Sequence, residues 1–131
     1  MVDKISKSDN EWRKQLSSPQ FAVTRGKATE PAFSGEYLDN KETGVYRCVC
    51  CETELFRSST KFESGCGWPS FWEPLLSGNV KEIKDSSHGM ERIEIVCAAC
   101  EAHLGHVFND GPQPTGLRYC INSLSLKFEK K

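Results

Sequence analysis

The chain has 131 residues, which is enough for one domain with a hydrophobic core and too few for two. Its 17 basic and 18 acidic side chains leave a net charge of −1, which offers no basic surface to nucleic acid or to an anionic membrane. Its seven cysteines do not fit a closed framework of secreted disulfides, and they favour metal or redox chemistry in the reducing cytoplasm.

The first thirty residues predict a polar, partly helical arm. Ser8 or Asp9 can cap a short helix, and Trp12 and Leu16 are its apolar positions. The Ser-Ser-Pro sequence that follows ends this helix or begins a second one. Three large apolar side chains are expected to pack the arm against the body: Phe21, Val23 and Phe33. The arm contains no apolar segment of the secretory type, and we expect no membrane helix in the chain.

From residue 44 onward, short runs of β-branched and aromatic residues are separated by Gly, Pro, Asn and Asp. The candidate strands are Gly44–Cys48, Lys61–Glu63, Val80–Asp85, Arg92–Cys97, His106–Phe108 and Arg118–Phe128. No helices alternate with these strands, so the pattern favours antiparallel pairing. We predict a mainly β fold in which residues 1–131 form one domain. Its β core, at 44–128, is a small antiparallel barrel or two-sheet structure preceded by short helices.

Two C-x-x-C pairs predict a metal site. Cys48 and Cys51 form the first pair, and Cys97 and Cys100 form the second. Each pair can place two sulfurs on one ion from a tight turn, so the two pairs complete a tetrahedral site for one Zn²⁺. Such a closed site leaves no position open for substrate, which favours a structural metal. A pair of redox disulfides is the alternative, and Cys50 inside the first pair can compete for the ion.

Three cysteines remain, namely Cys50, Cys66 and Cys120. Cys66 stands between two glycines, which leave its sulfur open and let other backbone approach closely. Trp68 beside it can form one wall of a pocket. The neighbouring Phe71 and Trp72 are interpreted instead as a small aromatic core under the loop.

The segment 101–116 brings acid–base groups into a Gly-rich loop after the second metal pair. A histidine is the usual proton donor or acceptor near neutral pH, and His103 and His106 lie within four positions of each other, with Asp110 close behind. A structural role is the alternative for each of these residues. His88 is expected to lie in a loop, and there is less support for a catalytic role of this residue. Glu91 and Glu94 are interpreted as solvated strand positions.

The last predicted strand alternates with a period of two. Its inward face carries Leu124, Leu126 and Phe128, and its solvent face carries Ser123, Ser125, Lys127 and Glu129. The same alternation, continued backwards, places Arg118, Cys120 and Asn122 in line with the core leucines. A nearby guanidinium favours the thiolate form of a cysteine. On this strand alone, a buried structural cysteine and a reactive one fit equally well.

Four runs together resemble a known family: SGCGWPSF at 64–71, HLGHVF at 103–108, DGPQPTG at 110–116 and RYCINS at 118–123. They are similar to the B-type peptide-methionine (R)-S-oxide reductases in their zinc-containing form, and the similarity extends from about Trp12 to Phe128. The resemblance implies a small β-rich barrel of two antiparallel sheets with short N-terminal helices. It also implies an oxidoreductase that reduces methionine-R-sulfoxide, in proteins or as the free amino acid, to methionine.

The resemblance also implies how the reaction proceeds. Cys120 corresponds to the nucleophile, which attacks the sulfoxide sulfur and becomes a sulfenic acid. Cys66 corresponds to the resolving cysteine, which forms a Cys66–Cys120 disulfide that thioredoxin reduces. The chain is expected to work as a monomer, without nucleic acid or membrane partners.

The remaining matched positions imply binding and proton-transfer roles. His103, His106 and Asn122 match residues that hydrogen-bond or protonate the sulfoxide oxygen. The substrate methyl group would lie against Trp68 and Phe108. Arg118 is expected to activate Cys120, and Asp110 to orient the histidine loop. Cys50 has no counterpart. A zinc-ribbon binding module without activity is the competing interpretation, but such a module would need neither Cys66 nor Cys120. A thioredoxin-like use of a C-x-x-C pair lacks the required βαβ pattern.

Overall fold

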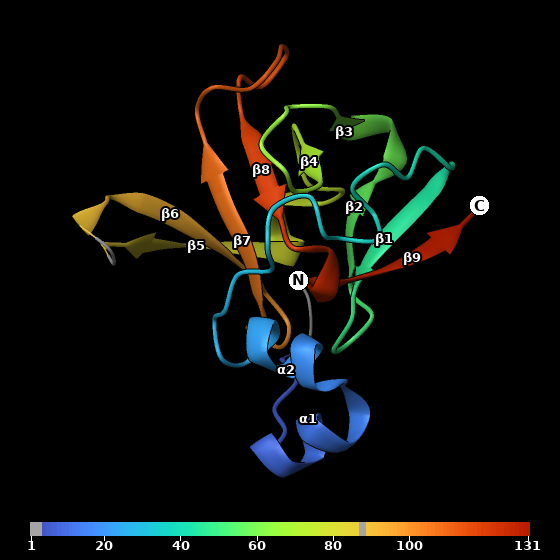
Figure 1. The fold of residues 1–131 in the computed structure, drawn as a ribbon, viewed down its shortest axis with the longest axis vertical. Coiled ribbons are helices and arrows are strands. Elements are labelled where there is room, and N and C mark those ends of the chain that lie inside the picture. The colour runs from blue at the N-terminus through green and yellow to red at the C-terminus, as the bar shows by residue number, and fades with distance from the viewer. Residues whose placement is uncertain (1–3, 87–88) are drawn as a thin grey trace.

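A computed structural model describes residues 4–86 and 89–131, so the loop expected at His88 lies outside the described residues. Two helices come first, and strands follow them (Figure 1): α1 (Asp9–Gln15), α2 (Ser18–Thr24), β1 (Gly44–Cys48), β2 (Glu54–Arg57), β3 (Lys61–Phe62), β4 (Ser70–Phe71), β5 (Val80–Asp85), β6 (Arg92–Cys97), β7 (His103–Phe108), β8 (Arg118–Ile121) and β9 (Leu126–Lys130). No helix in the described ranges is both long and apolar enough to cross a membrane.

The strands form two antiparallel sheets. The smaller sheet has the order β2-β1-β9, and the larger has the order β3-β4-β8-β7-β6-β5. Both helices lie together at one end of the molecule, beyond the sheets (Figure 1). The prediction of a mainly β fold with two antiparallel sheets and short N-terminal helices is therefore confirmed.

Most of the expected strands are present, with differences at their ends. Three of them have the predicted bounds, namely β1, β5 and β6. The predicted strand at His106–Phe108 begins three residues earlier, at His103, because it pairs with β6 along its whole length. The strands β2 and β4 were not predicted. The two residues of β4 follow Pro69 directly, too short a run to show a period of two.

The prediction of one continuous strand from Arg118 to Phe128 is wrong. The chain leaves the larger sheet after β8, makes a short 3₁₀ turn at Ser123–Ser125, and joins the smaller sheet as β9. The alternation therefore does not run through the turn. On β8 the buried side chains are Tyr119 and Ile121, so Cys120 points away from the core that these two enter.

The serines of this turn are buried, although alternation placed them in solvent. Ser123 is 2% exposed and Ser125 is fully buried. Burial of a hydroxyl is tolerated when it is hydrogen-bonded. The Ser125 hydroxyl donates to the carbonyl of His103 at 2.8 Å, and the Ser123 hydroxyl accepts from the backbone N–H of Tyr37 at 3.2 Å.

Aromatic side chains from both sheets form the centre of the core. The rings of Phe56 and Phe71 are stacked with their centroids 4.5 Å apart, and Tyr46 meets Phe71 edge-on at 5.1 Å. Tyr119 of β8 contacts Phe56 at 5.7 Å. The core therefore joins β8, the strand of Cys120, to the smaller sheet.

The helical arm is capped as the sequence predicts. Ser8 caps α1 and Ser17 caps α2, each in a capping box with the residue three positions later. Trp12 is 1% exposed, and the guanidinium of Arg25 lies over its ring at 4.6 Å.

The side chains expected to hold the arm against the body do not all do so. Val23 is buried and Phe21 packs at the edge of the core. Phe33, in contrast, is 69% exposed, so its predicted role in packing is wrong. Its backbone has a positive φ of 65°, which is uncommon for a residue with a side chain.

Gly105 of β7 offers a test of the strand pairing around Cys120. A Cβ atom at this position would lie 1.9 Å from the carbonyl oxygen of Cys120, which is backbone and cannot move aside. We expect Gly105→Ala to lower the free energy of unfolding by about 2–4 kcal/mol in urea titrations. At Gly78 no atom lies within 4 Å of an added Cβ, so Gly78→Ala should change the free energy of unfolding by less than about 0.5 kcal/mol. Equal effects would contradict this pairing.

Candidate active site

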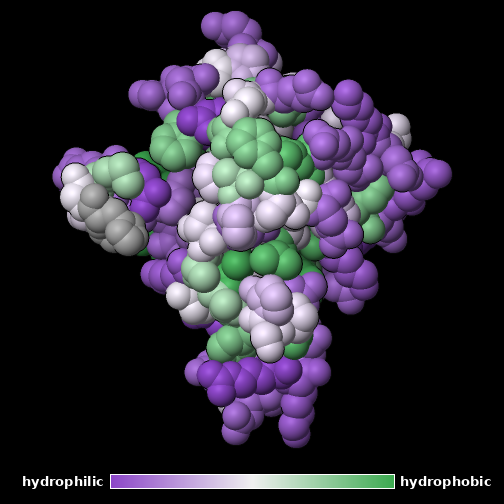
Figure 2. All heavy atoms as spheres, in the orientation of Figure 1, coloured by the Kyte–Doolittle hydropathy of each residue, from purple (hydrophilic) through white to green (hydrophobic). Residues whose placement is uncertain are grey.

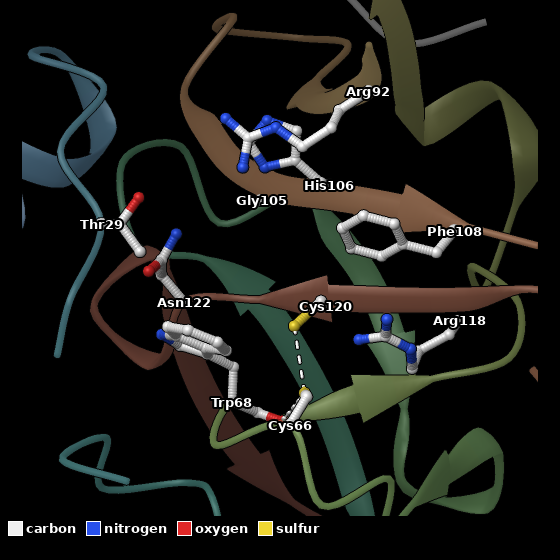
Figure 3. Close-up of a pocket in the computed structure, with 10 residues that line it drawn as sticks. All are labelled: Thr29, Cys66, Trp68, Arg92, Gly105, His106, Phe108, Arg118, Cys120 and Asn122. Atoms are coloured by element: carbon white, nitrogen blue, oxygen red, sulfur yellow. Dashed lines mark hydrogen bonds between the residues drawn. The ribbon is translucent and has the colours of Figure 1, made fainter. Parts of the chain in front are cut away.

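A cavity of about 250 Å³ opens beside Cys120. Its lining includes most of the residues that the sequence singled out: Cys66, Trp68, His106, Phe108, Arg118, Cys120 and Asn122. In Figure 3, Cys120 projects from β8 between the aromatic and cationic side chains of β7 and β8 on one side and the Cys66–Trp68 loop on the other. The volume of this cavity is suitable for one unbranched side chain that carries a polar group.

Backbone pairing of β8 with two neighbours places the reactive groups. Cys120 is the register partner of His106 on β7 and of Ser70 on β4. The loop 64–69 directly precedes β4 and carries Cys66 back over the strand. Three segments distant in sequence thus meet at one sulfur atom.

The two sulfurs of Cys66 and Cys120 lie 3.2 Å apart. Ser64 donates its hydroxyl to Cys66 Sγ at 3.0 Å, and the hydroxyl of Ser70 lies 3.4 Å from the same sulfur. The hydrogen bond from Cys120, helped by these hydroxyls, lowers the pKa of Cys66 to about 4. The same hydrogen bond, with burial, raises the pKa of Cys120. The contact therefore favours one thiol and one thiolate in this pair.

Arg118 acts against the rise in the pKa of Cys120, because its positive charge favours the thiolate. Its guanidinium lies over the ring of Phe108 at 4.5 Å. Arg118 also donates two hydrogen bonds to Asp110, from Nε at 2.9 Å and from Nη2 at 3.2 Å. The carboxylate of Asp110 therefore fixes the arginine rather than a histidine.

The two histidines have carboxylate partners on β6 and β5. His103 Nδ1 lies 2.8 Å from Glu94 Oε2, and His106 Nε2 lies 2.8 Å from Asp85 Oδ2. Glu94 is 4% exposed, so its interpretation as a solvated strand position is wrong. Glu91 is exposed, but it lies just before β6 rather than within a strand.

The histidines differ in their access to the cavity. His106 lines it, whereas His103 is buried behind and faces an adjoining cavity of about 320 Å³. The rings meet edge-on with their centroids 5.6 Å apart. Burial lowers the pKa of His103, and its hydrogen bond with Glu94 opposes this shift. Among the two, only His106 is placed to touch a molecule beside Cys120.

Glu30 connects the wall and the floor of the cavity. Its carbonyl accepts the indole N–H of Trp68 at 2.9 Å, and its N–H donates to Asn122 Oδ1 at 3.0 Å. Its side chain accepts from the N–H of Leu124 at 2.9 Å, in the turn between the sheets. Asn122 donates in turn to the carbonyl of Leu104 at 3.0 Å. Burial raises the pKa of the Glu30 carboxyl.

The C-x-x-C pairs come together away from this cavity. The sulfurs of Cys48, Cys51, Cys97 and Cys100 all lie within 4.8 Å of one another. The separations Cys48–Cys100 and Cys51–Cys97 are both 3.6 Å. Four thiolates about 2.3 Å from a tetrahedral zinc would be separated by about 3.8 Å. The donor set therefore fits a metal ion, and none of its members lines the Cys120 cavity.

Cys50 is buried at 3% exposure but is not one of these four. Its carbonyl accepts a hydrogen bond from the side chain of Gln15 on α1. A second link to the arm lies nearby, because Arg25 donates to the carbonyl of Cys100 at 2.8 Å. The arm thus covers the metal-binding turns.

Several residues of the site were not found from the sequence. Thr29, Arg92 and Gly105 line the cavity, and Asp85 and Glu94 hold the histidines. The carboxylates lie on two predicted strands, but their pairing with the histidines depends on the order of the strands in the sheet, which was not predicted. Thr29 comes from the irregular arm, and its sequence carried no sign of this position.

Comparison with known proteins gives a family for the fold and the site. Residues 16–130 match the model of the SelR domain. The chain is 61% identical over 127 residues to a peptide methionine sulfoxide reductase MsrB of Hahella chejuensis, covering 97% of this chain and 91% of that protein. It is 58% identical to the protein of the same name from Herminiimonas arsenicoxydans (98% and 94% covered) and 56% identical to that from Acinetobacter baylyi (98% and 92% covered).

Burial of His103 predicts how stability depends on pH. Because its pKa is lowered in the folded state, the unfolded chain binds the proton more readily. The stabilising contribution is complete above the unfolded pKa of about 6.5 and decreases as the pH falls below it. In His103→Asn, an amide can donate to Glu94 but does not titrate. Urea titrations at about pH 7.5 and pH 5.5 should therefore show a smaller loss of stability in the variant. An equal loss in both proteins would contradict this role.

Proposed function

The chain belongs to the SelR family of peptide methionine sulfoxide reductases, and we propose that it reduces the R epimer of methionine sulfoxide through a sulfenic acid on Cys120. The observation that carries this proposal is the 3.2 Å contact between Cys66 and Cys120 on the wall of a cavity that fits one side chain. The family match, from 16 to 130, supports treating the chain as one reductase domain. The chain is proposed to act as a monomer.

The first step makes Cys120 the nucleophile. Its proton passes to the thiolate of Cys66 along the 3.2 Å contact, and Arg118 stabilises the thiolate left on Cys120. This thiolate attacks the sulfoxide sulfur while His106 gives a proton to the oxygen. The oxygen moves to Cys120 as an S–OH group, and methionine leaves. The substrate sulfur gains two electrons, and the sulfur of Cys120 loses two.

The cavity walls set the orientation of the substrate. The methyl group would lie against Trp68 and Phe108, and the polar sulfoxide oxygen would point to His106 and Asn122. With the methyl group and the oxygen held in this way, the two epimers differ in the side on which the sulfur carries its lone pair. The cavity can therefore distinguish them. His103 acts behind His106, through the ring contact and its bond with Glu94.

The second step forms a disulfide. Cys66 attacks the S–OH sulfur of Cys120, and one water molecule leaves with the proton of Cys66 and the hydroxyl. A disulfide bond is about 2.04 Å long, so the sulfurs need to approach by about 1.2 Å from 3.2 Å. The loop of Cys66 therefore needs no large movement. A dithiol protein of the thioredoxin type would then reduce the disulfide by thiol exchange.

We assign one structural Zn²⁺ to Cys48, Cys51, Cys97 and Cys100. Their sulfur separations support a tetrahedral ion. Four thiolate ligands would leave no open coordination position on the ion. Such a metal would cross-link the chain and take no part in the reaction. The four cysteines join the end of β1 in one sheet to the end of β6 in the other. Reduction of sulfoxide would use none of them.

Substitution of the two remaining cysteines tests the mechanism. With dithiothreitol and both epimers of a methionine sulfoxide peptide, the wild type should reduce the R epimer alone. Cys120→Ser should have only background activity, because a serine hydroxyl is not ionised and cannot take the oxygen. Cys66→Ser should complete its first turnover but fail to cycle with thioredoxin. Full activity of Cys120→Ser would refute the mechanism.

Metal analysis tests the four-cysteine site. Freshly purified protein should contain about one zinc per chain, and Cys97→Ser should lose it together with most of the folded structure. Cys50→Ser is the matched control, since it removes a buried thiol of the same turn and leaves the four ligands. Protein that holds no metal and withstands a chelator unchanged would rule out the assignment.

A further inference from the structure

The exposed ring of Phe33 is held firmly in place beside the site. The N–H of Phe33 donates to the carbonyl of Gly67 at 2.7 Å, directly between Cys66 and Trp68 in sequence. A Cβ atom on Gly67 would lie 3.1 Å from the Phe33 ring, so ring and loop are in contact. With a φ of 65° and 69% exposure, this residue combines an unusual backbone with an apolar ring in water. Such a combination indicates a surface used for binding.

A groove runs from this ring toward the cavity of Cys120. It has a volume of about 310 Å³, and its apolar walls come from Phe33, Leu38, Phe62 and Trp68. Trp68 also lines the Cys120 cavity, so the two spaces meet at one indole ring. In the space-filling view, apolar atoms are exposed near the middle of this face, over the position of β4 and β8 in Figure 1 (Figure 2).

We propose that this groove binds the residues next to methionine sulfoxide in a polypeptide substrate, with Phe33 as the main contact. This inference rests on the proposed function, because a chain whose oxidised methionine fills the Cys120 cavity has to leave it along a neighbouring surface. Consecutive Cα atoms are about 3.8 Å apart. One or two residues beyond the methionine sulfoxide, the peptide can therefore reach the groove on the other side of the Trp68 ring. A space of about 310 Å³ takes one or two side chains.

Two further observations describe the peptide that fits. Phe62 belongs to β3, the edge strand of the larger sheet, and extended peptides bind along such edges. The polar side chains of the groove include Asp39 and Glu63, both exposed. Glu63 is paired with Lys41 at 3.3 Å. Because these carboxylates are compensated by lysines and the walls are apolar, the groove favours apolar neighbours of methionine sulfoxide over charged ones.

A protein reductant is the other class of molecule that could use this surface. Even a transient redox complex would cover roughly 500 Å² on each partner, which is wider than one groove, and it would have to reach the Cys66–Cys120 disulfide itself. The continuity of the groove with the substrate cavity through Trp68 favours the peptide.

The test compares three substrates in the intact protein with dithiothreitol as reductant. They are a capped methionine-R-sulfoxide amide, a peptide with leucine on both sides of the sulfoxide, and the same peptide with aspartate. The wild type should prefer the leucine peptide to the aspartate peptide. Phe33→Ala should lower kcat/KM for the leucine peptide about tenfold and leave the capped amide within about twofold.

Two more variants separate binding from folding. Phe33→Gly suits the positive φ, so it should fold well and show the same selective loss. Leu76→Ala is the control, because this side chain is 57% exposed but lines neither space. Leu76→Ala should leave kcat/KM unchanged for all three substrates.

The outcomes are distinguishable. Equal loss on all three substrates, no loss on any, or a loss seen with thioredoxin but not with dithiothreitol would overturn the groove as a substrate site. The last result would assign it to the reductant. A wild type that reduces none of the substrates would refute the proposed function itself.

Discussion

The site depends on the position of Cys120 within β8, which is paired on both sides. The register sets His106 of β7 opposite the cysteine on one side and Ser70 of β4 on the other. Cys120 cannot move along the strand unless both ladders break, so its distances to a proton donor and to the Cys66 loop are fixed by backbone hydrogen bonds. Gly105 permits this close pairing, because any side chain there would meet the Cys120 carbonyl. The position of Cys120 is thus a property of the sheet, and the loop 64–69 brings Cys66 and Trp68 to it.

The remaining structure holds β8 and its neighbours in this arrangement. The chain passes from one sheet to the other directly after the cysteine strand, and Glu30 of the arm binds that turn together with Trp68 and Asn122. At the start of β7, the four metal-binding cysteines join the two sheets, and Cys100 lies three residues before the strand begins. A metal there would act on the reaction only by keeping β6 and β7 in register.

The sequence was most informative where chemistry and short-range pattern coincide. The two C-x-x-C pairs led to the four sulfurs that the structure brings together, and alternation gave β5 and β6 their bounds. Alternation failed at 118–128, because a period of two looks the same across two strands interrupted by one turn. Glu94 and Phe33 were also misplaced, because their environments depend on strands and loops distant in sequence. The partners of the histidines required the sheet order, which local pattern does not contain.

Of the seven cysteines, Cys120 and Cys66 are the two whose thiols are proposed to supply the two electrons that reduce the sulfoxide. Peptide mapping after one turnover tests this proposal most directly: fully reduced, metal-loaded protein reacts with methionine-R-sulfoxide in the absence of any reductant. One methionine and one Cys66–Cys120 disulfide should form per chain, with Cys50 and the four metal-binding cysteines still reduced. A disulfide that includes Cys50 or one of those four, or methionine formed while Cys66 and Cys120 both remain thiols, would contradict the proposal.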